Sequence, residues 1–362
     1  MNSDSTANTE TLAERLVAAL EIFESAQRAY FPGIVPRLRE QLNPTIGALK
    51  ETIGSLKKIP PPPEKEVLQR KLMEASGLCL DAMNLSIVAD SMEEALANFR
   101  KAARRINRSQ ELLLPLCPML PAVNRYFLEP VLRDRASEFL SGTGPEPSAG
   151  LFHGGLDEDP YARGSVSFYI PETGNLTEPL PLVVALHGGF GHGRDFIWMW
   201  LREARSRRFA LACPSSRNIT WTIMGPDADA LLLHKVLAYA DGKWNIDYSR
   251  ILLTGLSDGA TYVLKRALDT QTPFTHFAVV SGVLAPFDLT YAKGRRILWV
   301  HGAKDWMFPA WRAKTGEKEL ASAGADVTLE IVPDLYHAYP REKNDRILNW
   351  FDPKLALPGR LS

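Results

Sequence analysis

Ser257 lies at the centre of Gly255-Leu256-Ser257-Asp258-Gly259, which follows an apolar run and precedes a helical pattern. A serine between two glycines at a strand-to-helix turn is typical of a nucleophile elbow. The glycines fit because the turn is so tight that side chains there would collide with the neighbouring strand and helix. The pattern predicts that Ser257 attacks an acyl carbon. The alternative is an ordinary turn with a serine near a helix start, a position that serine favours.

A serine hydroxyl needs a base to take its proton and a third group to orient that base. Asp305 and His337 each follow an apolar strand pattern later in the chain. The order serine, aspartate, histidine, with each residue on its own post-strand loop, is the order that the hydrolase topology delivers. We therefore predict His337 as the general base and Asp305 as the carboxylate that orients it.

Other acidic and basic side chains compete for these roles. Asp288 follows the preceding strand pattern and Asp334 is close to His337 in sequence, so either could replace Asp305. His192 lies in a glycine-rich loop and could touch a substrate. His301 falls at a strand end, where packing is the simpler expectation.

The tetrahedral intermediate of acyl transfer also needs backbone donors for its oxyanion. An apolar strand pattern ends in His187-Gly188-Gly189-Phe190-Gly191, and glycines let a backbone approach a substrate oxygen closely. We predict the N–H of Gly189 as one donor, with Phe190 as runner-up, and the N–H of Asp258 as the other. His187 is expected to brace the loop. The alternative is a glycine-rich turn without a ligand.

Aromatic residues are frequent in the loops that carry these candidates. We expect Phe190, Trp221 and Trp306 to line an apolar substrate pocket. Core packing is the alternative for each of them.

The elements that must position these residues alternate between strands and helices after residue 160. Apolar strand patterns occur at 165–170, 180–186, 209–213, 251–254, 276–280, 297–301 and 327–332. Helical patterns cover 226–241, 261–268, 311–323 and 343–351. This alternation predicts βαβ units and a mostly parallel sheet, in which ligands bind beyond the carboxyl ends of the strands.

Residues from about 160 to 352 resemble the α/β-hydrolase superfamily, and within it the phospholipase/carboxylesterase and polyhydroxybutyrate-depolymerase-like esterases. The resemblance is carried by His187-Gly188-Gly189, the Ser257 motif, His301-Gly302-Ala303-Lys304-Asp305 and His337. It implies an α/β-hydrolase fold and a serine hydrolase that cleaves carboxylic esters or thioesters of small molecules through an acyl-enzyme, without a cofactor. Asp258 places a carboxylate beside the nucleophile, which is expected to disfavour anionic substrates.

Two alternative functions remain open at this point. A peptidase of the same fold would use the same residues, because the triad cannot distinguish an ester from an amide. A non-catalytic scaffold would act through the first part of the chain instead. Covalent labelling by a fluorophosphonate separates a scaffold from an enzyme with an activated serine.

The first 140 residues show helical periodicity and no strand-like alternation. Apolar residues from Leu12 to Phe23 recur at helical spacing, a second helix is expected from about Pro44 to Lys58, and Ser91 opens a capping box. We predict an all-α domain at 1–140, a linker at 141–159 and a catalytic domain at 160–362. The amphipathic helices make a homo-oligomer through the helical domain a further hypothesis.

The composition of the 362 residues is balanced, with 42 basic and 42 acidic side chains. Nothing in it indicates binding to nucleic acid or to an anionic membrane surface. Three widely spaced cysteines form neither a disulfide framework nor a metal-binding pattern, and no apolar run is long enough to span a membrane. The N-terminus lacks the features of a signal peptide, so a cytoplasmic location is expected.

Overall fold

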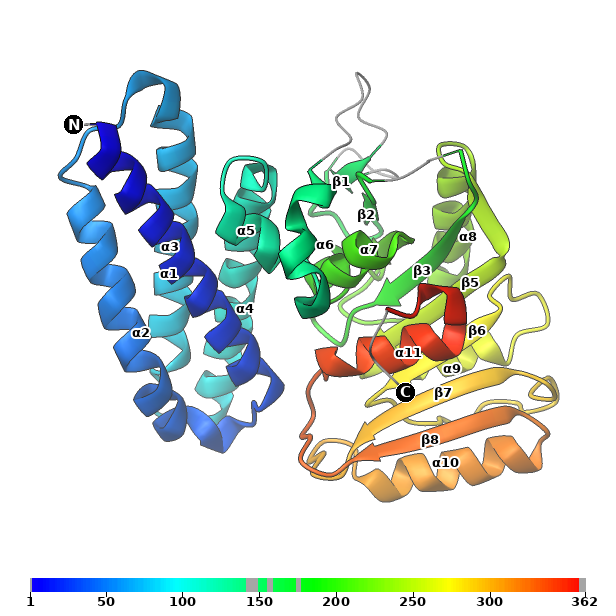
Figure 1. The fold of residues 1–362 in the computed structure, drawn as a ribbon. Coiled ribbons are helices and arrows are strands. Elements are labelled where there is room, and N and C mark those ends of the chain that lie inside the picture. The colour runs from blue at the N-terminus through cyan, green and yellow to red at the C-terminus, as the bar shows by residue number, and fades with distance from the viewer. Residues whose placement is uncertain (1, 141–148, 155–158, 174–176, 358–362) are drawn as a thin grey trace. The chain divides into compact units, whose positions relative to one another are not determined.

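The computed structural model describes residues 2–140, 149–154, 159–173 and 177–357, and it divides the chain into two compact units. The first unit is Met1–Leu140 and the second is Ser141–Ser362 (Figure 1). Each unit has its own architecture, all-helical in the first and alternating in the second, as the sequence predicts.

The first unit consists of helices α1 to α5 and several short 3₁₀ segments. The helices are α1 (Asn2–Arg28), α2 (Val35–Leu56), α3 (Glu66–Ser86), α4 (Met92–Leu113) and α5 (Pro121–Tyr126). The stripe predicted from Leu12 to Phe23 is fully buried, and α1 packs against α2, α3 and α5. Ser91 caps α4 by accepting the N–H of Glu94 at 3.1 Å, so the predicted helix start is confirmed.

One detail of the helical prediction is wrong. Helix α2 begins at Val35, and Pro44 lies inside it. The buried face of Leu38, Leu42 and Leu49 continues across the proline, and the packing of this face outweighs the missing N–H. After α5, residues Pro130–Phe139 form a 3₁₀ helix.

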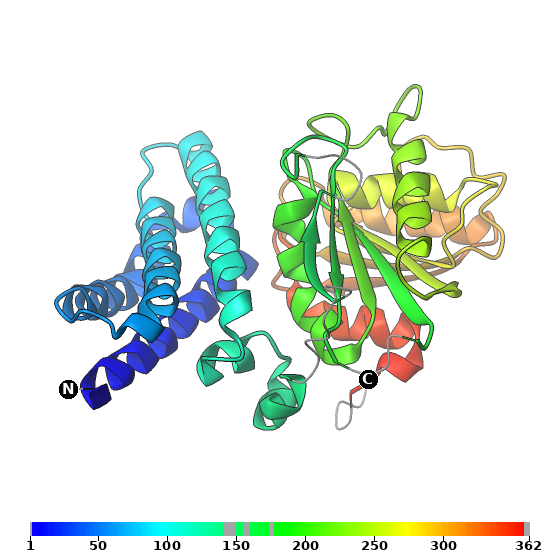
Figure 2. The ribbon, with the colours of Figure 1, turned by 90° about the horizontal axis from the view of Figure 1, so that it is seen from above.

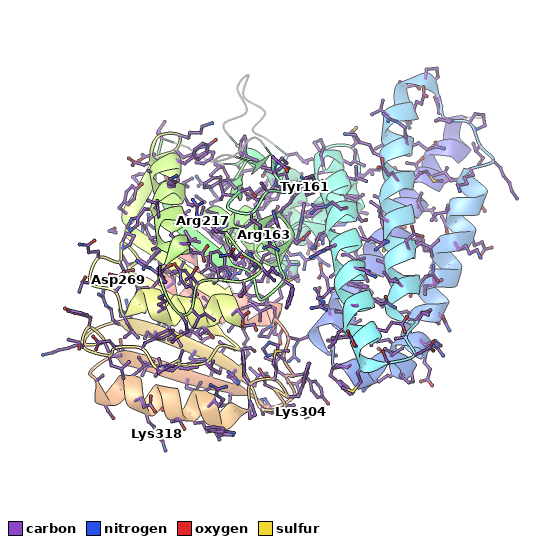
Figure 3. All side chains as sticks on the ribbon, turned by 180° about the vertical axis from the view of Figure 1, so that it is seen from behind. Tyr161, Arg163, Arg217, Asp269, Lys304 and Lys318 are labelled. Atoms are coloured by element: carbon purple, nitrogen blue, oxygen red, sulfur yellow. The ribbon has the colours of Figure 1, made fainter. Side chains whose placement is uncertain are left out.

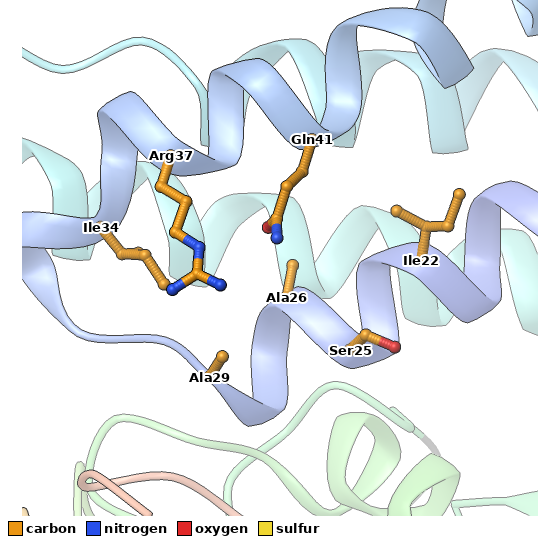
Figure 4. A pocket seen from close by; sticks show the side chains of 7 residues that line it. All are labelled: Ile22, Ser25, Ala26, Ala29, Ile34, Arg37 and Gln41. Carbon is orange, nitrogen blue, oxygen red and sulfur yellow. The ribbon is translucent and has the colours of Figure 1, made fainter. Parts of the chain in front are cut away.

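A surface pocket of about 350 Å³ lies between the end of α1 and the start of α2 (Figure 4). It is lined by Ile22, Ser25, Ala26, Ala29, Ile34, Arg37 and Gln41. Arg37 is the charged residue of this lining, and the lining contains no carboxylate or imidazole. The pocket therefore lacks the acid and base groups that catalysis would need.

The second unit contains an eight-stranded sheet with the order β1-β2-β4-β3-β5-β6-β7-β8. The strands are β1 (Gly150–His153), β2 (Val166–Ile170), β3 (Leu180–Leu186), β4 (Ala210–Pro214), β5 (Ile246–Leu256), β6 (His276–Val280), β7 (Arg296–Gly302) and β8 (Asp326–Val332). Strands β4, β3, β5, β6, β7 and β8 run parallel to one another. Strand β1 pairs antiparallel with β2, and β2 pairs antiparallel with β4. The predicted mostly parallel sheet is confirmed.

Strand β1 lies within 141–159, the range expected as a linker. Gly150–His153 pairs with β2 along its whole length, and this pairing, which a short local sequence does not reveal, makes it an edge strand. The residues 141–148 and 155–158 of that range lie outside the described part of the chain.

Helices cover both faces of the sheet, and Figure 2 shows α8, α9 and α10 on one face and α11 on the other. The helices of this unit are α6 (Gly193–Phe196), α7 (Leu201–Arg207), α8 (Ala228–Asp241), α9 (Asp258–Ala267), α10 (Ala310–Ser322) and α11 (Asn344–Phe351). The main core packs α8, α9 and α10 against the sheet around Trp299 and Phe277. Because β3, β4, β5 and β7 run parallel, the loops that follow them lie at the same end of the sheet. Within the described ranges, no helix has the length and apolar character needed to cross a membrane.

Candidate active site

Ser257 occupies a tight turn between β5 and α9. Its φ of 55° and ψ of −117° place it in a strained region of the backbone for a residue other than glycine. The flanking glycines are required by space, because a Cβ at Gly255 would lie 2.7 Å from Gly259 and a Cβ at Gly259 would lie 2.4 Å from the His187 carbonyl oxygen. The N–H of Ser257 donates to Val280 at 2.9 Å, which fixes the turn against β6.

The residues predicted as nucleophile, base and orienting carboxylate lie within hydrogen-bonding distance of one another. His337 Nε2 lies 2.9 Å from Ser257 Oγ, and His337 Nδ1 lies 2.8 Å from Asp305 Oδ2. Because a carboxylate only accepts hydrogen bonds, Nδ1 carries the proton, and Nε2 is free to accept the serine hydroxyl. This arrangement can withdraw a proton from Ser257.

Asp305 is held in place by the loop that follows β7. It is 4% exposed, and its Oδ1 accepts the backbone N–H groups of Met307 and Phe308 at 3.0 and 2.7 Å. The Phe308 ring stands edge-on to the His337 ring, with their centroids 5.2 Å apart. Backbone donors thus fix one carboxylate oxygen, and the other faces the imidazole.

The competing acidic residues lie elsewhere. Asp288 is exposed and its carboxylate accepts the N–H and hydroxyl of Thr290, while Asp334 is also exposed. His301 is buried and its Nε2 donates to the Phe308 carbonyl at 2.7 Å; burial lowers its pKa, so it packs as a neutral residue.

His192, considered as a substrate contact, belongs to the structure of its loop. Its Nδ1 accepts the N–H of Arg194 at 3.2 Å and caps α6, and its Nε2 donates to the Tyr161 carbonyl at 3.1 Å. Both ring nitrogens are therefore engaged, and burial lowers the pKa of the imidazole.

The loop after β3 passes directly beside Ser257. A Cβ at Gly188 would lie 3.4 Å from the Ser257 Cβ, and a Cβ at Gly189 would lie 2.6 Å from Asp258 Oδ2. The N–H of Phe190, the predicted runner-up as oxyanion donor, already donates to the Ile219 carbonyl at 3.0 Å. Gly189 is consequently the better candidate of the two.

His187 braces this loop from beneath. It is 2% exposed, its Nδ1 donates to the Gly188 carbonyl at 2.7 Å, and its Nε2 accepts the N–H of Ser216 at 3.0 Å. Burial lowers the pKa of His187 to about 3. The imidazole is therefore neutral at ordinary pH and serves the loop as a hydrogen-bonding strut.

The structure separates the three aromatic residues that were expected to line a pocket. The expectation that Trp221 lines a pocket is wrong. Trp221 is 2% exposed, stacks on Tyr262 with ring centroids 5.4 Å apart, and donates its indole N–H to the His187 carbonyl. Its indole needs that buried carbonyl as an acceptor, which places it in the core and not in a pocket. Phe190 is 58% exposed and Trp306 is 43% exposed, with the Trp306 ring 6.4 Å from the His337 ring.

Sequence reasoning missed the part played by the segment after β4. Thr220 Oγ1 donates to Asp258 Oδ2 at 2.6 Å, and the buried Asp229 carboxylate accepts hydrogen bonds from this segment. Ile219 and Met224, 58% and 66% exposed, belong to the same stretch. The position of the segment after a parallel strand was the available signal, because such loops lie at the same edge as the candidate catalytic residues.

The described residues were also compared with the ligand sets that hold metal ions. In the ranges that the structure describes, no group of three or more histidine, cysteine, aspartate or glutamate residues is arranged to hold a metal ion. Cys79, Cys117 and Cys213 are all buried.

Parts of the second unit are similar to known proteins. Residues 228–352 match the model of the phospholipase/carboxylesterase family. Esterase YpfH of Escherichia coli (strain K12) is 28% identical over 193 residues, which are 52% of this chain and 74% of that protein.

Two solved structures are also similar to about half of the chain. An acetyl xylan esterase from Aspergillus awamori is 17% identical with a TM-score of 0.42, over 52% of this chain and 93% of that one. An S-formylglutathione hydrolase from Agrobacterium tumefaciens is 18% identical with a TM-score of 0.43, over 53% of this chain and 90% of that one. The second unit of this chain is therefore similar, over residues 228–352, to the phospholipase/carboxylesterase family.

Proposed function

We propose that the chain is a serine esterase that hydrolyses carboxylic esters of small molecules through an acyl-enzyme. The observation that carries this proposal is the continuous series of hydrogen bonds from Asp305 through His337 to Ser257, at 2.8 and 2.9 Å. The ester-hydrolase family match supports the same reaction class.

In the first half-reaction, Ser257 Oγ forms a bond to the ester carbonyl carbon while its proton passes to His337 Nε2. The imidazolium is stabilised by the Asp305 carboxylate at Nδ1. The tetrahedral intermediate then expels the alcohol, which takes the proton from Nε2 as its C–O bond breaks. An acyl group remains on Ser257.

In the second half-reaction, water takes the place of the alcohol. His337 accepts a proton from the water as its oxygen attacks the acyl carbon, and it returns that proton to Ser257 Oγ as the acid leaves. Every proton transfer is thus assigned to a side chain of this unit. A thioester would follow the same steps with a thiol as leaving group.

The N–H groups of Gly189 and Asp258 are the proposed donors to the oxyanion. Both belong to segments near Ser257, since a Cβ at Gly188 would lie 3.4 Å from the Ser257 Cβ and Asp258 is the next residue in the chain. Donors that are positioned before the reaction stabilise the developing charge without reorganisation.

The Asp258 carboxylate shapes which substrates can be accepted. It lies beside Gly189 and receives a hydrogen bond from Thr220, so its negative charge is close to the position of the acyl group. We therefore propose that esters with an anionic acyl group are poor substrates.

Cations lie farther along the same loops. Arg163 donates to the Gly191 carbonyl at 2.7 Å, and a Cβ at Gly164 would lie 3.9 Å from the Arg217 side chain. Figure 3 shows Arg163 and Arg217 close together, with Lys304 apart from them. The charge around the proposed site is therefore mixed, and a neutral ester suits it.

Large apolar side chains border the proposed site on both sides. Phe190 and Ile219, which are joined by a backbone hydrogen bond, are exposed beside the oxyanion loop, and Trp306 is exposed near His337. Exposed apolar side chains that gather in one patch often mark a ligand-binding groove. We propose that they contact the apolar acyl or alcohol group of the substrate.

Trp306→Ala is expected to change chain-length preference. The variant should lose about tenfold in kcat/KM for esters that reach the indole and much less for acetate, because burying a large side chain contributes roughly 1.5–3 kcal/mol. Comparing kcat/KM for p-nitrophenyl acetate and p-nitrophenyl octanoate checks this. Trp311→Ala, another exposed tryptophan, on α10, is the matched control. An unchanged preference in Trp306→Ala would remove this residue from the substrate contacts.

The proposed function is tested by the wild-type chain on p-nitrophenyl esters from acetate to dodecanoate, with fluorophosphonate labelling in parallel. We expect hydrolysis of at least part of the series and labelling of one serine, Ser257. Hydrolysis of anilides but not esters would favour a peptidase, and absence of both hydrolysis and labelling would favour a scaffold.

The role of the helical unit is a separate proposal. We keep the hypothesis that it forms a homo-oligomer, although the apolar stripe of α1 is already covered by α2, α3 and α5. Val67, Val88, Met92 and Met119 are among the apolar side chains of this unit that remain exposed. Sedimentation of the full chain tests the idea, and a monomer at all concentrations would overturn it. The proposed location of the enzyme is the cytoplasm.

A further inference from the structure

The segment 216–222, which follows β4, contacts both sides of the proposed oxyanion hole. The Ile219 carbonyl accepts the N–H of Phe190 at 3.0 Å, and Thr220 Oγ1 donates to Asp258 Oδ2 at 2.6 Å. Phe190 directly follows the first proposed donor, and Asp258 itself supplies the second. A displacement of this segment would therefore move both donors relative to Ser257.

Asp229 holds the segment from the first turn of α8. Its side chain is fully buried, and its Oδ1 accepts the N–H of Arg217 at 2.9 Å. Its Oδ2 accepts both the N–H and the hydroxyl of Thr222, each at 2.8 Å. All three donors belong to the segment 216–222, so one buried carboxylate fixes both ends of it.

The buried carboxylate and its three donors depend on one another. A buried carboxylate is costly unless hydrogen bonds replace the water it has lost, and the three donors do so here. The position near the N-terminus of α8 adds a favourable interaction with the helix dipole. Leaving one donor of the segment without its acceptor would cost free energy, which the segment can relieve by moving.

Other residues support the segment from neighbouring elements. Lys265, on α9, donates to the Thr222 carbonyl at 2.7 Å, and His187 accepts the N–H of Ser216 at 3.0 Å. These contacts come from the two elements that carry Ser257 and the oxyanion loop. The segment therefore connects α8 to the catalytic edge of the sheet.

We infer that Asp229 is a positioning residue for ester hydrolysis, which sets the geometry of the oxyanion hole through the segment 216–222. This inference rests on the proposed function. Asp229 does not touch the reacting atoms; it acts through Phe190 and Asp258. Its effect is on stabilisation of the transition state and not on the binding of the ester in its ground state.

Asp229→Asn tests the inference, because it keeps the size of the side chain. It replaces one carboxylate oxygen by an NH₂ group, which cannot accept a hydrogen bond from Arg217 or Thr222. We expect kcat for a p-nitrophenyl ester to fall about 10- to 100-fold, with KM changed less than about threefold. The same variant is measured on the matching thionoester, whose sulfur gains less from the N–H donors. The ratio of oxyester to thionoester kcat should fall about tenfold, as expected when oxyanion stabilisation is lost.

The matched control is Asp247→Asn at the start of β5, where the carboxylate also accepts the N–H and hydroxyl of one residue, Ser249. This control should leave the ratio unchanged. If Asp229→Asn does not fold, Thr222→Val removes one of the three bonds, and Thr222→Ser should restore both kcat and the ratio.

An equal loss with the oxyester and the thionoester would contradict the inference, because fewer folded molecules lower both rates alike. That result would leave the proposed function intact if the wild type hydrolyses the oxyester. A wild type without activity on either substrate would instead overturn the proposed function, and the inference with it.

Discussion

Ser257→Ala is expected to lower kcat for ester hydrolysis by about 10⁴-fold or more and to abolish labelling by a fluorophosphonate. The reason is that the side chain within 2.9 Å of His337 Nε2 is the proposed nucleophile, and water must replace it. Loss of the nucleophile in a comparable triad costs about 10⁶ in kcat, while the oxyanion donors and substrate binding retain a residual rate enhancement. The measurement is steady-state hydrolysis of the best p-nitrophenyl ester.

The chain offers a matched control for this substitution. Ser281 lies at the end of β6, is fully buried and has a φ of 51°, close to the 55° of Ser257. Alanine should be tolerated equally at both turns, and the Ser281 Oγ has no hydrogen-bond partner in the part of the chain that is described. Ser281→Ala should therefore keep wild-type activity. Retention of more than a tenth of the activity in Ser257→Ala would contradict the proposed mechanism.

The candidate catalytic residues could be predicted from sequence because they follow strands, and the strands can be recognised from their apolar runs. The strands at 180–186 and 276–280 have the bounds that their continuous apolar runs predict, since both faces of these strands are buried. In a parallel sheet, residues that follow such runs meet at one edge. The adjacency of Ser257, Asp305 and His337 follows from that topology, although their separations along the chain are large.

Features that depend on one distant partner could not be predicted. Trp221 is indistinguishable in sequence from a pocket residue, and the buried His187 carbonyl that accepts its indole N–H decides its place. Strand β1 exists because β2 offers it an edge, and the face of α2 that packs into the helical unit outweighs the cost of Pro44.

The role proposed for Asp229 also could not be predicted from sequence. Its sequence position predicts only an acidic residue in the first turn of a helix, which is a common place for one. Its importance arises because Arg217 and Thr222 direct three donors toward it. The direction of those donors is set by the fold of the preceding loop, and spacing in the sequence does not reveal it.

Asp305→Asn is expected to reduce kcat by about 10⁴-fold while the fold is retained. Asp305 Oδ1 accepts the N–H groups of Met307 and Phe308, so an asparagine would keep its carbonyl oxygen on these donors. Its amide nitrogen would then face His337 Nδ1 and donate to it. The imidazole would carry its proton on Nε2, and it could no longer accept the proton of Ser257.

This prediction separates Asp305 from its competitor in the sequence. Asp288→Asn is the matched control, because this exposed carboxylate also accepts hydrogen bonds from its own turn, namely from the N–H and hydroxyl of Thr290. It should leave kcat within about twofold of the wild type, because exposed substitutions rarely change stability by more than about 0.5 kcal/mol. Circular dichroism at increasing temperature should show cooperative unfolding of Asp305→Asn, so that lost activity reflects the wrong tautomer of His337. If Asp305→Asn reacts with a fluorophosphonate as fast as the wild type, His337 does not depend on this carboxylate. That result would contradict the proposed role of Asp305.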